Sequence, residues 1–124
     1  MDGTKACPFC DRADAVIANV LAHARYDKFP VTRGHLLVIP HRHVADWFET
    51  TAEERQAMFA LADQARALLR DTYGAEGFNL GINVGEVAGQ TIAHVHLHII
   101  PRYRGDVSDP RGGVRGVIPG KQSY

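Results

Sequence analysis

Three histidines, His94, His96 and His98, occupy alternate positions in the last third of the sequence. Side chains two residues apart project from the same face of a β-strand, so the three rings are expected to form a row, with Val95 and Leu97 turned toward the core. Imidazole is a nucleophile and a metal ligand, and its protonated form attracts phosphate. The spacing predicts catalysis on a phosphate ester, metal binding, or both, and a plain solvent-facing row is the simplest alternative.

Strand geometry limits how many of these rings can share one metal ion. The rise along a strand separates His94 from His98 by about 13 Å, whereas Zn–N bonds are ~2 Å long. At most two of the three rings can therefore bind one ion. At least one is left for nucleophilic or acid–base work.

Two cysteines, Cys7 and Cys10, are separated by two residues. Residues 1–5 lack the hydrophobic region of a secretory signal, and no apolar stretch approaches the ~18–20 residues of a membrane helix. We therefore expect a cytoplasmic protein without a membrane partner, in which thiols stay reduced. The pair is then half of a zinc site, a redox pair or two unremarkable thiols, and spacing alone leaves these open.

Composition narrows the functional class. The chain has 124 residues, 45% hydrophobic and 23% charged, which fits one globular domain. Fourteen Lys and Arg balance fourteen Asp and Glu, so a surface for a nucleic-acid duplex is not expected.

Hydrophobic periodicity predicts the elements that position the histidines. A long amphipathic helix is expected from a capping box at Thr50 and Glu53 to a stop near Gly74. Residues 13–26 fit either a helix or two short strands, and the chain after Arg104 is expected to be an extended or irregular tail. Apolar or alternating runs predict strands over residues 35–40, 78–84 and 94–100, the last one ending before Pro101.

The histidine segment and its surroundings together resemble a known family. The run from His94 to Ile100 is similar to the His-φ-His-φ-His-φ-φ signature of the histidine triad (HIT) superfamily of nucleotide hydrolases and transferases. The tail from Asp109 to Pro119 resembles that of bacterial HIT proteins often described as diadenosine polyphosphate hydrolases. Other family-like segments follow in family order, namely Tyr26-Asp27, Gly34 to Pro40, Arg42-His43, Asn83 and Gly89-Gln90-Thr91.

The resemblance implies an α+β, HIT-like fold. It predicts an antiparallel sheet of about five strands with one long helix and one or more short helices, usually paired into a homodimer. Much of residues 16–26 would then be strand. Residues 1–124 would form a single domain, with a core over 7–104 and an extended tail over 105–124.

The resemblance also implies roles for individual residues. His96 matches the nucleophile that attacks the α-phosphorus of a nucleotide and forms a nucleotidyl-histidine intermediate. His98 matches the residue that contacts the phosphate oxygens, and His35 matches a further histidine of the same pocket. The remaining matches are nucleotide-binding positions: Asp27 at the ribose hydroxyls, Asn83 at the phosphate or ribose, and Gln90 and Thr91 near the leaving group.

Some bacterial members of this family bind structural zinc through four positions that this sequence matches with Cys7, Cys10, His43 and His94. A Cys2His2 set suits a closed tetrahedral site. His41 stands where the family commonly has lysine and is a second candidate for the histidine ligand.

The leading hypothesis is a hydrolase that attacks the α-phosphate of a purine ribonucleotide conjugate such as a diadenosine polyphosphate. A nucleoside phosphoramidase, a nucleotidyltransferase and a non-catalytic nucleotide-binding module are the alternatives. A metalloenzyme with zinc at the catalytic centre is a further one.

Overall fold

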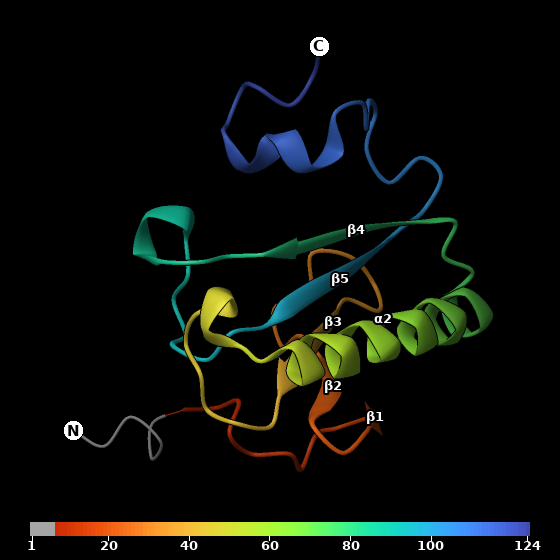
Figure 1. The fold of residues 1–124 in the computed structure, drawn as a ribbon. Coiled ribbons are helices and arrows are strands. Elements are labelled where there is room, and N and C mark those ends of the chain that lie inside the picture. Colours follow the sequence, from red (N-terminus) through yellow and green to blue (C-terminus); the bar gives the residue numbers. More distant parts are fainter. Residues whose placement is uncertain (1–6) are drawn as a thin grey trace.

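The computed structural model describes residues 7–124, so the expectations about residues 1–5 and about where the domain begins lie outside it. Five antiparallel strands form one sheet in the order β1-β2-β3-β5-β4, and a long helix covers one of its faces (Figure 1). The predicted α+β class is confirmed. The strands are β1 (Ile17–Ala18), β2 (Ala22–Tyr26), β3 (Leu36–Pro40), β4 (Gly77–Ile82) and β5 (Leu97–Arg102).

The helices are one α-helix, α2 (Ala52–Tyr73), and three short 3-10 helices among residues 7–124. The short helices are η1 (Trp47–Glu49), η2 (Glu86–Ala88) and η3 (Gly113–Val117). None of these helices is long and apolar enough to cross a membrane.

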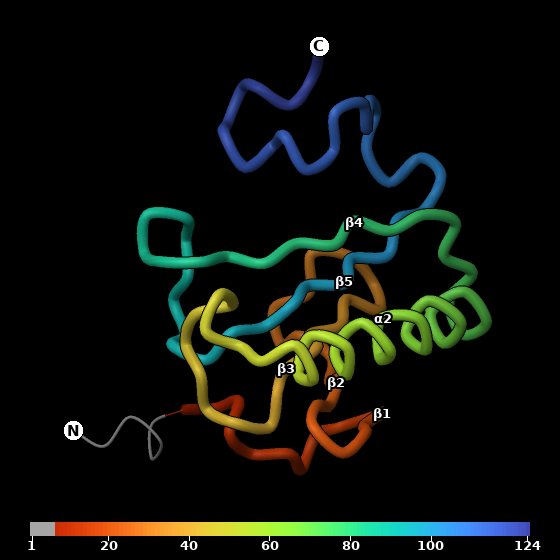
Figure 2. Tube along the Cα trace, viewed as in Figure 1, coloured from red at the N-terminus to blue at the C-terminus, as the bar shows by residue number. Residues whose placement is uncertain are grey.

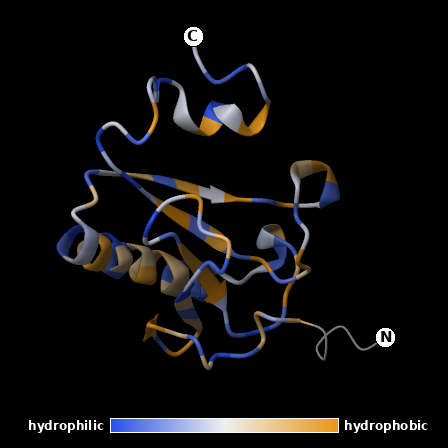
Figure 3. Cartoon of the chain, turned by 180° about the vertical axis from the view of Figure 1, so that it is seen from behind, coloured by the Kyte–Doolittle hydropathy of each residue, from blue (hydrophilic) through white to orange (hydrophobic). Residues whose placement is uncertain are grey.

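The main core lies between α2 and the sheet. Buried residues recur along α2 at Met58, Leu61, Ala65 and Leu69, the spacing of a single helix face. They pack against buried side chains of the strands, and Figure 3 shows hydrophobic residues along the central strands and mixed hydropathy along α2. The strand members of this cluster are Ala22, Ala24, Leu36, Val38, Leu97 and Ile99.

The helix begins one residue later than predicted. Its N-cap is Thr51, whose hydroxyl accepts from the backbone N–H of Glu54 at 3.0 Å, while the Glu54 carboxylate accepts from the Thr51 N–H at 2.9 Å. Thr50 instead donates its hydroxyl to the carbonyl of Trp47 and closes η1. The predicted end is confirmed, because Gly74 takes the left-handed conformation at φ 73°.

The histidine strand differs most from its prediction. β5 starts at Leu97, so His94 and His96 precede it, and it runs through Pro101 to Arg102. Pro101 is tolerated because β5 pairs with β3 only as far as Ile99, which leaves no ladder partner for a Pro101 N–H on that side.

The segment over 13–26, which fits helix or strand by its sequence, forms β1 and β2, as the family resemblance implies. The tail is not wholly extended, since it contains η3, but none of the residues of η3 is buried. Contacts with β4 hold η3 beside the edge of the sheet (Figure 1).

Candidate active site

The three histidines share one side of their segment, as the alternation predicts. Val95, Leu97 and Ile99 are all buried in the opposite direction. His94 and His96 lie outside the sheet ladder because Val95 donates its N–H to the carbonyl of Val44 at 2.8 Å. The segment is therefore anchored to the chain that follows β3, and Figure 2 shows the two segments meeting at one end of the sheet.

His96 has a fixed tautomer. Its Nδ1 lies 3.0 Å from the carbonyl oxygen of His94, so Nδ1 carries the proton and donates it. In the neutral ring, Nε2 then holds a free lone pair. The pKa of His96 is lowered, first because burial disfavours the charged ring, and this keeps the lone pair available at neutral pH.

A chain of hydrogen bonds orients His98. The backbone N–H of Val31 donates to Nδ1 of His35 at 3.1 Å, which places the proton of the neutral His35 ring on Nε2. That nitrogen lies 3.0 Å from Nδ1 of His98 and donates to it. His98 is left with its own proton on Nε2, free to donate, and its ring centroid lies 5.0 Å from that of His96.

Burial shifts the pKa of both rings in this chain. The pKa of His98 falls to about 4, first through burial and then through repulsion by His96 and His35 in their charged forms. Burial also lowers the pKa of His35, although the carboxylate of Asp27, 3.5 Å from its Nε2, acts in the opposite direction. The three imidazole rings are therefore neutral at pH 7.

Gly34 allows the tight turn that places His35 in the histidine cluster. Its φ of 88° is unfavourable for other residues, and a Cβ there would lie 2.9 Å from the Tyr73 ring and 3.0 Å from Leu69. The chain thus turns into β3 directly against α2, which places the ring of His35, only 3% exposed, on the opposite face of the sheet.

Asp27 follows β2 and reaches the same cluster. One carboxylate oxygen accepts from the N–H of Phe29 at 2.9 Å, and the other faces His35. Beside it lies a hollow of about 110 Å³ lined mainly by aromatic and aliphatic side chains. The lining includes Phe9, Phe29, Leu37 and Ile92.

Sequence reasoning missed Phe9, Phe29 and Ile92. Phe9, one of the two residues between the cysteines, is buried, and its ring centroid lies 4.9 Å from that of His96. Arg25 holds this segment on the sheet by donating to the carbonyl of Pro8 at 3.0 Å and lying over the Phe9 ring. The alternation along β2, which turns Arg25 away from α2, was the available signal.

The other predicted nucleotide-binding residues differ in their surroundings. Asn83 is half-buried and lines a cavity with His35 and His98. Gln90 joins its own loop to the segment that follows β3: its amide accepts from the Gly85 N–H and donates to the carbonyls of Ile92 and Ala45. Thr91 is exposed.

The four predicted metal-binding residues come together. Ligand atoms of Cys7, Cys10, His43 and His94 all lie within 4.8 Å of one another. Sγ of Cys7 is 3.3 Å from Nδ1 of His94, and Sγ of Cys10 is 3.2 Å from Nδ1 of His43. Tetrahedral zinc with Zn–S of about 2.3 Å and Zn–N of about 2.0 Å requires ligand separations of roughly 3.3–3.8 Å, so the set could hold such an ion.

The hydrogen bonding of His94 supports this arrangement. Its Nε2–H donates to the carbonyl of Pro40 at 2.8 Å, which leaves Nδ1 as the lone-pair nitrogen facing the sulfurs. His41 is not part of the cluster, because β3 ends at Pro40 and the His41 ring stacks on His23 with centroids 5.3 Å apart.

A family model described as the HIT domain matches residues 11–105. An uncharacterized HIT-like protein of Mycoplasma genitalium is 42% identical over 106 residues, which cover 81% of this chain and 75% of the relative. The AP-4-A phosphorylase of Mycobacterium tuberculosis is 34% identical over 71% of this chain and 46% of its own length. The asymmetrical bis(5'-nucleosyl)-tetraphosphatase of Schizosaccharomyces pombe is 39% identical over 64% of this chain and 44% of its own.

Among solved structures, a zinc-bound histidine triad family protein from Mycobacterium smegmatis superimposes with a TM-score of 0.76. It is 34% identical, and the match covers 83% of this chain and 79% of that one. The triad geometry, the sheet topology and the match over residues 11–105 agree, and the chain belongs to the HIT family.

Proposed function

We propose that the protein is a nucleotide hydrolase that attacks the α-phosphate of a purine ribonucleotide conjugate, such as a diadenosine polyphosphate. The observation that carries this proposal is the pair of opposite tautomers at the centre of the site. His96 presents a lone pair on Nε2, and His98, 5.0 Å away between ring centroids, presents an N–H. A nucleophile beside a donor is what displacement at a phosphate requires.

The reaction proceeds in two displacements. Nε2 of His96 forms a bond to the α-phosphorus, the bond from that phosphorus to the bridging oxygen breaks, and the leaving nucleotide departs with the electron pair. Water then attacks the same phosphorus and releases its proton to solvent. The P–N bond breaks, its electron pair returns to Nε2, and a nucleoside monophosphate leaves.

His98 and His35 would serve the charge that develops on the phosphate oxygens. Nε2–H of His98 donates to such an oxygen, and His35 holds it in that tautomer through a bond of 3.0 Å. His35 is itself fixed by the backbone of Val31, so the donor is preorganised. Asn83 lines the same cavity and would contact the phosphate or ribose.

The retained nucleoside would lie on the other side of His96. Asp27 has one oxygen facing the cluster and can accept from ribose hydroxyls, which favours ribonucleotides. The neighbouring hollow, lined by Phe9 and Phe29, offers apolar faces to a purine base. Gln90 and Thr91, in the loop before His94, would lie toward the leaving group.

Transfer to phosphate is a second candidate, because one relative is a phosphorylase. The intermediate would be the same, with inorganic phosphate in place of water as the acceptor. Diadenosine tetraphosphate would then give ADP and ATP rather than AMP and ATP.

We further propose that the four-residue cluster binds structural zinc. The chemistry of the donor set fits this ion, and a zinc-bound relative has the same fold. A zinc ion bound by Cys7, Cys10, His43 and His94 would join the N-terminal segment to the two histidine-bearing segments. It would thereby hold Phe9 against the catalytic site. No catalytic step would pass through it.

We also propose a homodimer, by resemblance to the family. Exposed hydrophobic side chains on the tail, at Val114, Val117 and Ile118, support an interface there. Size-exclusion chromatography with light scattering is expected to give twice the chain mass of 13.6 kDa.

The function is tested by incubating the protein with diadenosine tetraphosphate, with and without inorganic phosphate, and separating the products by ion exchange. We expect AMP and ATP in both conditions, and loss of at least about 10³-fold in rate for His96→Ala. His41→Ala is the matched control, since His41 lies outside both clusters. ADP formed only with phosphate would identify a phosphorylase, and undiminished turnover by His96→Ala would refute the mechanism.

A further inference from the structure

The hollow beside Asp27 is lined by three charged side chains, those of Arg25, Asp27 and Lys28. The rest of its lining is aromatic or aliphatic, and such side chains offer contact area without reading the edge of a base. Tyr26 also carries a hydroxyl, but its ring packs into the main core, edge-on against Tyr73. Among the side chains of the hollow, the charged groups are therefore the ones that can distinguish one base from another.

Two of these three charged groups are already engaged. Arg25 is only 4% exposed and donates to the carbonyl of Pro8 at 3.0 Å and to Asp14 at 3.3 Å, while its Nε is buried from solvent. Asp27 accepts from a backbone N–H with one oxygen and faces His35 with the other. Neither group is left to bind the edge of a base.

The third group, the ammonium of Lys28, is free. Lys28 is exposed and lines the hollow, and its ammonium makes no hydrogen bond or ion pair with any residue among 7–124. The ammonium is carried on a flexible four-carbon stem and has three donors and no acceptor. The hollow thus combines apolar walls with one free cationic donor.

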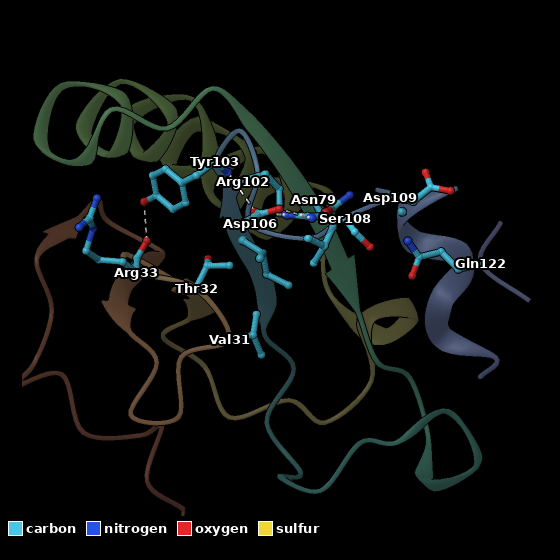
Figure 4. Close-up of a pocket in the computed structure, with 13 residues that line it drawn as sticks. Val31, Thr32, Arg33, Asn79, Arg102, Tyr103, Asp106, Ser108, Asp109 and Gln122 are labelled. Atoms are coloured by element: carbon cyan, nitrogen blue, oxygen red, sulfur yellow. Dashed lines mark hydrogen bonds and ion pairs between the residues drawn. The ribbon is translucent and has the colours of Figure 1, made fainter. Parts of the chain in front are cut away.

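The cations of a larger cavity beneath the C-terminal tail differ from Lys28 in this respect. This cavity has a volume of about 590 Å³, and Figure 4 shows its lining. Arg102 donates to the two oxygens of Asp106 at 2.7 and 2.8 Å. The guanidinium of Arg33 lies over the ring of Tyr103, 5.4 Å from its centroid. Both cations that line this cavity therefore have partners within the chain.

A group that can only donate favours one purine over the other. Guanine presents two neighbouring acceptors, O6 and N7, and lysine is one of the side chains that commonly pair with them. Adenine presents N7 beside an amino group, which is itself a donor and would face the ammonium. Arg25 adds a second positive charge to the hollow against the single negative charge of Asp27, so the local potential also favours the oxygen of guanine.

We propose that Lys28 determines the base of the retained nucleoside and selects guanine over adenine. The inference rests on the proposed function, which places that nucleoside in the hollow, and deepens it by naming the base. The preferred substrates are then ribonucleotide conjugates in which a guanosine carries the attacked α-phosphate.

Binding of nucleoside monophosphates to the unmodified protein tests this without turnover. Titration calorimetry compares GMP and AMP with inosine monophosphate (IMP), which has the O6 and N7 of GMP and lacks its amino group. We expect GMP and IMP each to bind about tenfold more tightly than AMP, which corresponds to ~1.4 kcal/mol. Lys28→Met keeps a long apolar stem without the donor and should bring the three dissociation constants together, by weakening GMP and IMP. Lys28→Arg keeps a cationic donor and should retain the preference.

Lys121→Met is the matched control, because Lys121 is an exposed lysine that lines neither the hollow nor the larger cavity. It is expected to keep the tenfold difference. Equal affinities of the unmodified protein for GMP and AMP, or a preference that survives Lys28→Met, would overturn the assignment. Two other results would also overturn it: a preference for GMP that IMP does not share, and equal weakening of all three nucleotides by Lys28→Met, which would place Lys28 at the phosphate. Failure of the proposed reaction is read separately, as the absence of His96-dependent products.

Discussion

His94 and His96 are two residues apart and expose opposite ring nitrogens, because each donates to a backbone carbonyl through a different nitrogen. His94 donates from Nε2 to Pro40 and turns Nδ1 toward the two cysteines. His96 donates from Nδ1 to the carbonyl of His94 and leaves Nε2 free. The backbone thus decides which lone pair is exposed: that of His94 faces the two sulfurs, and that of His96 faces the proposed substrate site.

The two clusters also differ in what their loss should affect. The cluster of Cys7, Cys10, His43 and His94 joins three segments that are distant in the sequence and lie outside the sheet ladder. The cluster of Asp27, His35, His96 and His98 is held by hydrogen bonds already present. Removal of the first should lower stability, and changes to the second should alter chemistry and proton binding.

The largest expected effect comes from the metal cluster. Cys10→Ser should abolish stoichiometric zinc binding and reduce the free energy of unfolding by at least about 3 kcal/mol, because metal binding is coupled to folding. Zinc content by elemental analysis and urea unfolding measure the two quantities. Immediate loss of activity on chelation, before any unfolding, would instead place zinc in catalysis.

Lowering the pH is expected to reduce the free energy of unfolding by a smaller amount. The folded pKa of His98, about 4, lies below the ordinary value of 6.5, so the unfolded chain binds a proton that the folded chain does not between these values. Stability from this residue is complete above pH 6.5 and falls as the pH drops toward 4, by up to ~1.4 kcal/mol per pH unit.

His98→Gln should flatten this dependence, since glutamine does not titrate. Urea unfolding of both proteins at pH 7, 6 and 5 measures the difference in their free energies of unfolding. The cluster of Cys7, Cys10, His43 and His94 contributes equally to both proteins and cancels. Parallel curves for the two proteins would show that His98 does not carry the depressed pKa.

The smallest effect is expected at a site remote from both clusters. Thr51 caps α2 on the other face of the sheet, and Thr51→Ala should reduce the free energy of unfolding by about 1 kcal/mol. Neither zinc content nor kcat should change. A fall in kcat would mean that general destabilisation reaches the catalytic cluster, which would blur the distinction between the two regions.

Much of the fold was predictable because local signals sufficed. The periodicity of α2 buries one face of the helix, the continuous apolar run of β3 is buried along its whole length, and Gly74 ends the helix. The start of β5 was not predictable, because the hydrogen bond from Val95 to Val44 removes His94 and His96 from the ladder and joins segments far apart in the sequence. The N-cap is Thr51 rather than Thr50, because the Thr50 hydroxyl already donates to the Trp47 carbonyl at the end of η1.

The site was predictable in residue type more than in arrangement. The Cys and His spacing, read with the family resemblance, named the four residues whose ligand atoms lie within 4.8 Å of one another. The part played by Phe9 depends on Arg25 drawing the N-terminal segment onto the sheet, and the cavity beneath the tail depends on η3 folding back beside β4. Both are long-range contacts, which periodicity does not reveal.

The most direct test of the account is to look for the bond on His96. The protein is mixed with excess diadenosine tetraphosphate, quenched within milliseconds in alkaline denaturant, and analysed by peptide mass spectrometry. The account predicts an adenylate adduct on the peptide containing residues 94–98, localised to His96 and absent from His96→Ala. Rapid release of AMP with no adduct at any time, or an adduct on another residue, would contradict it.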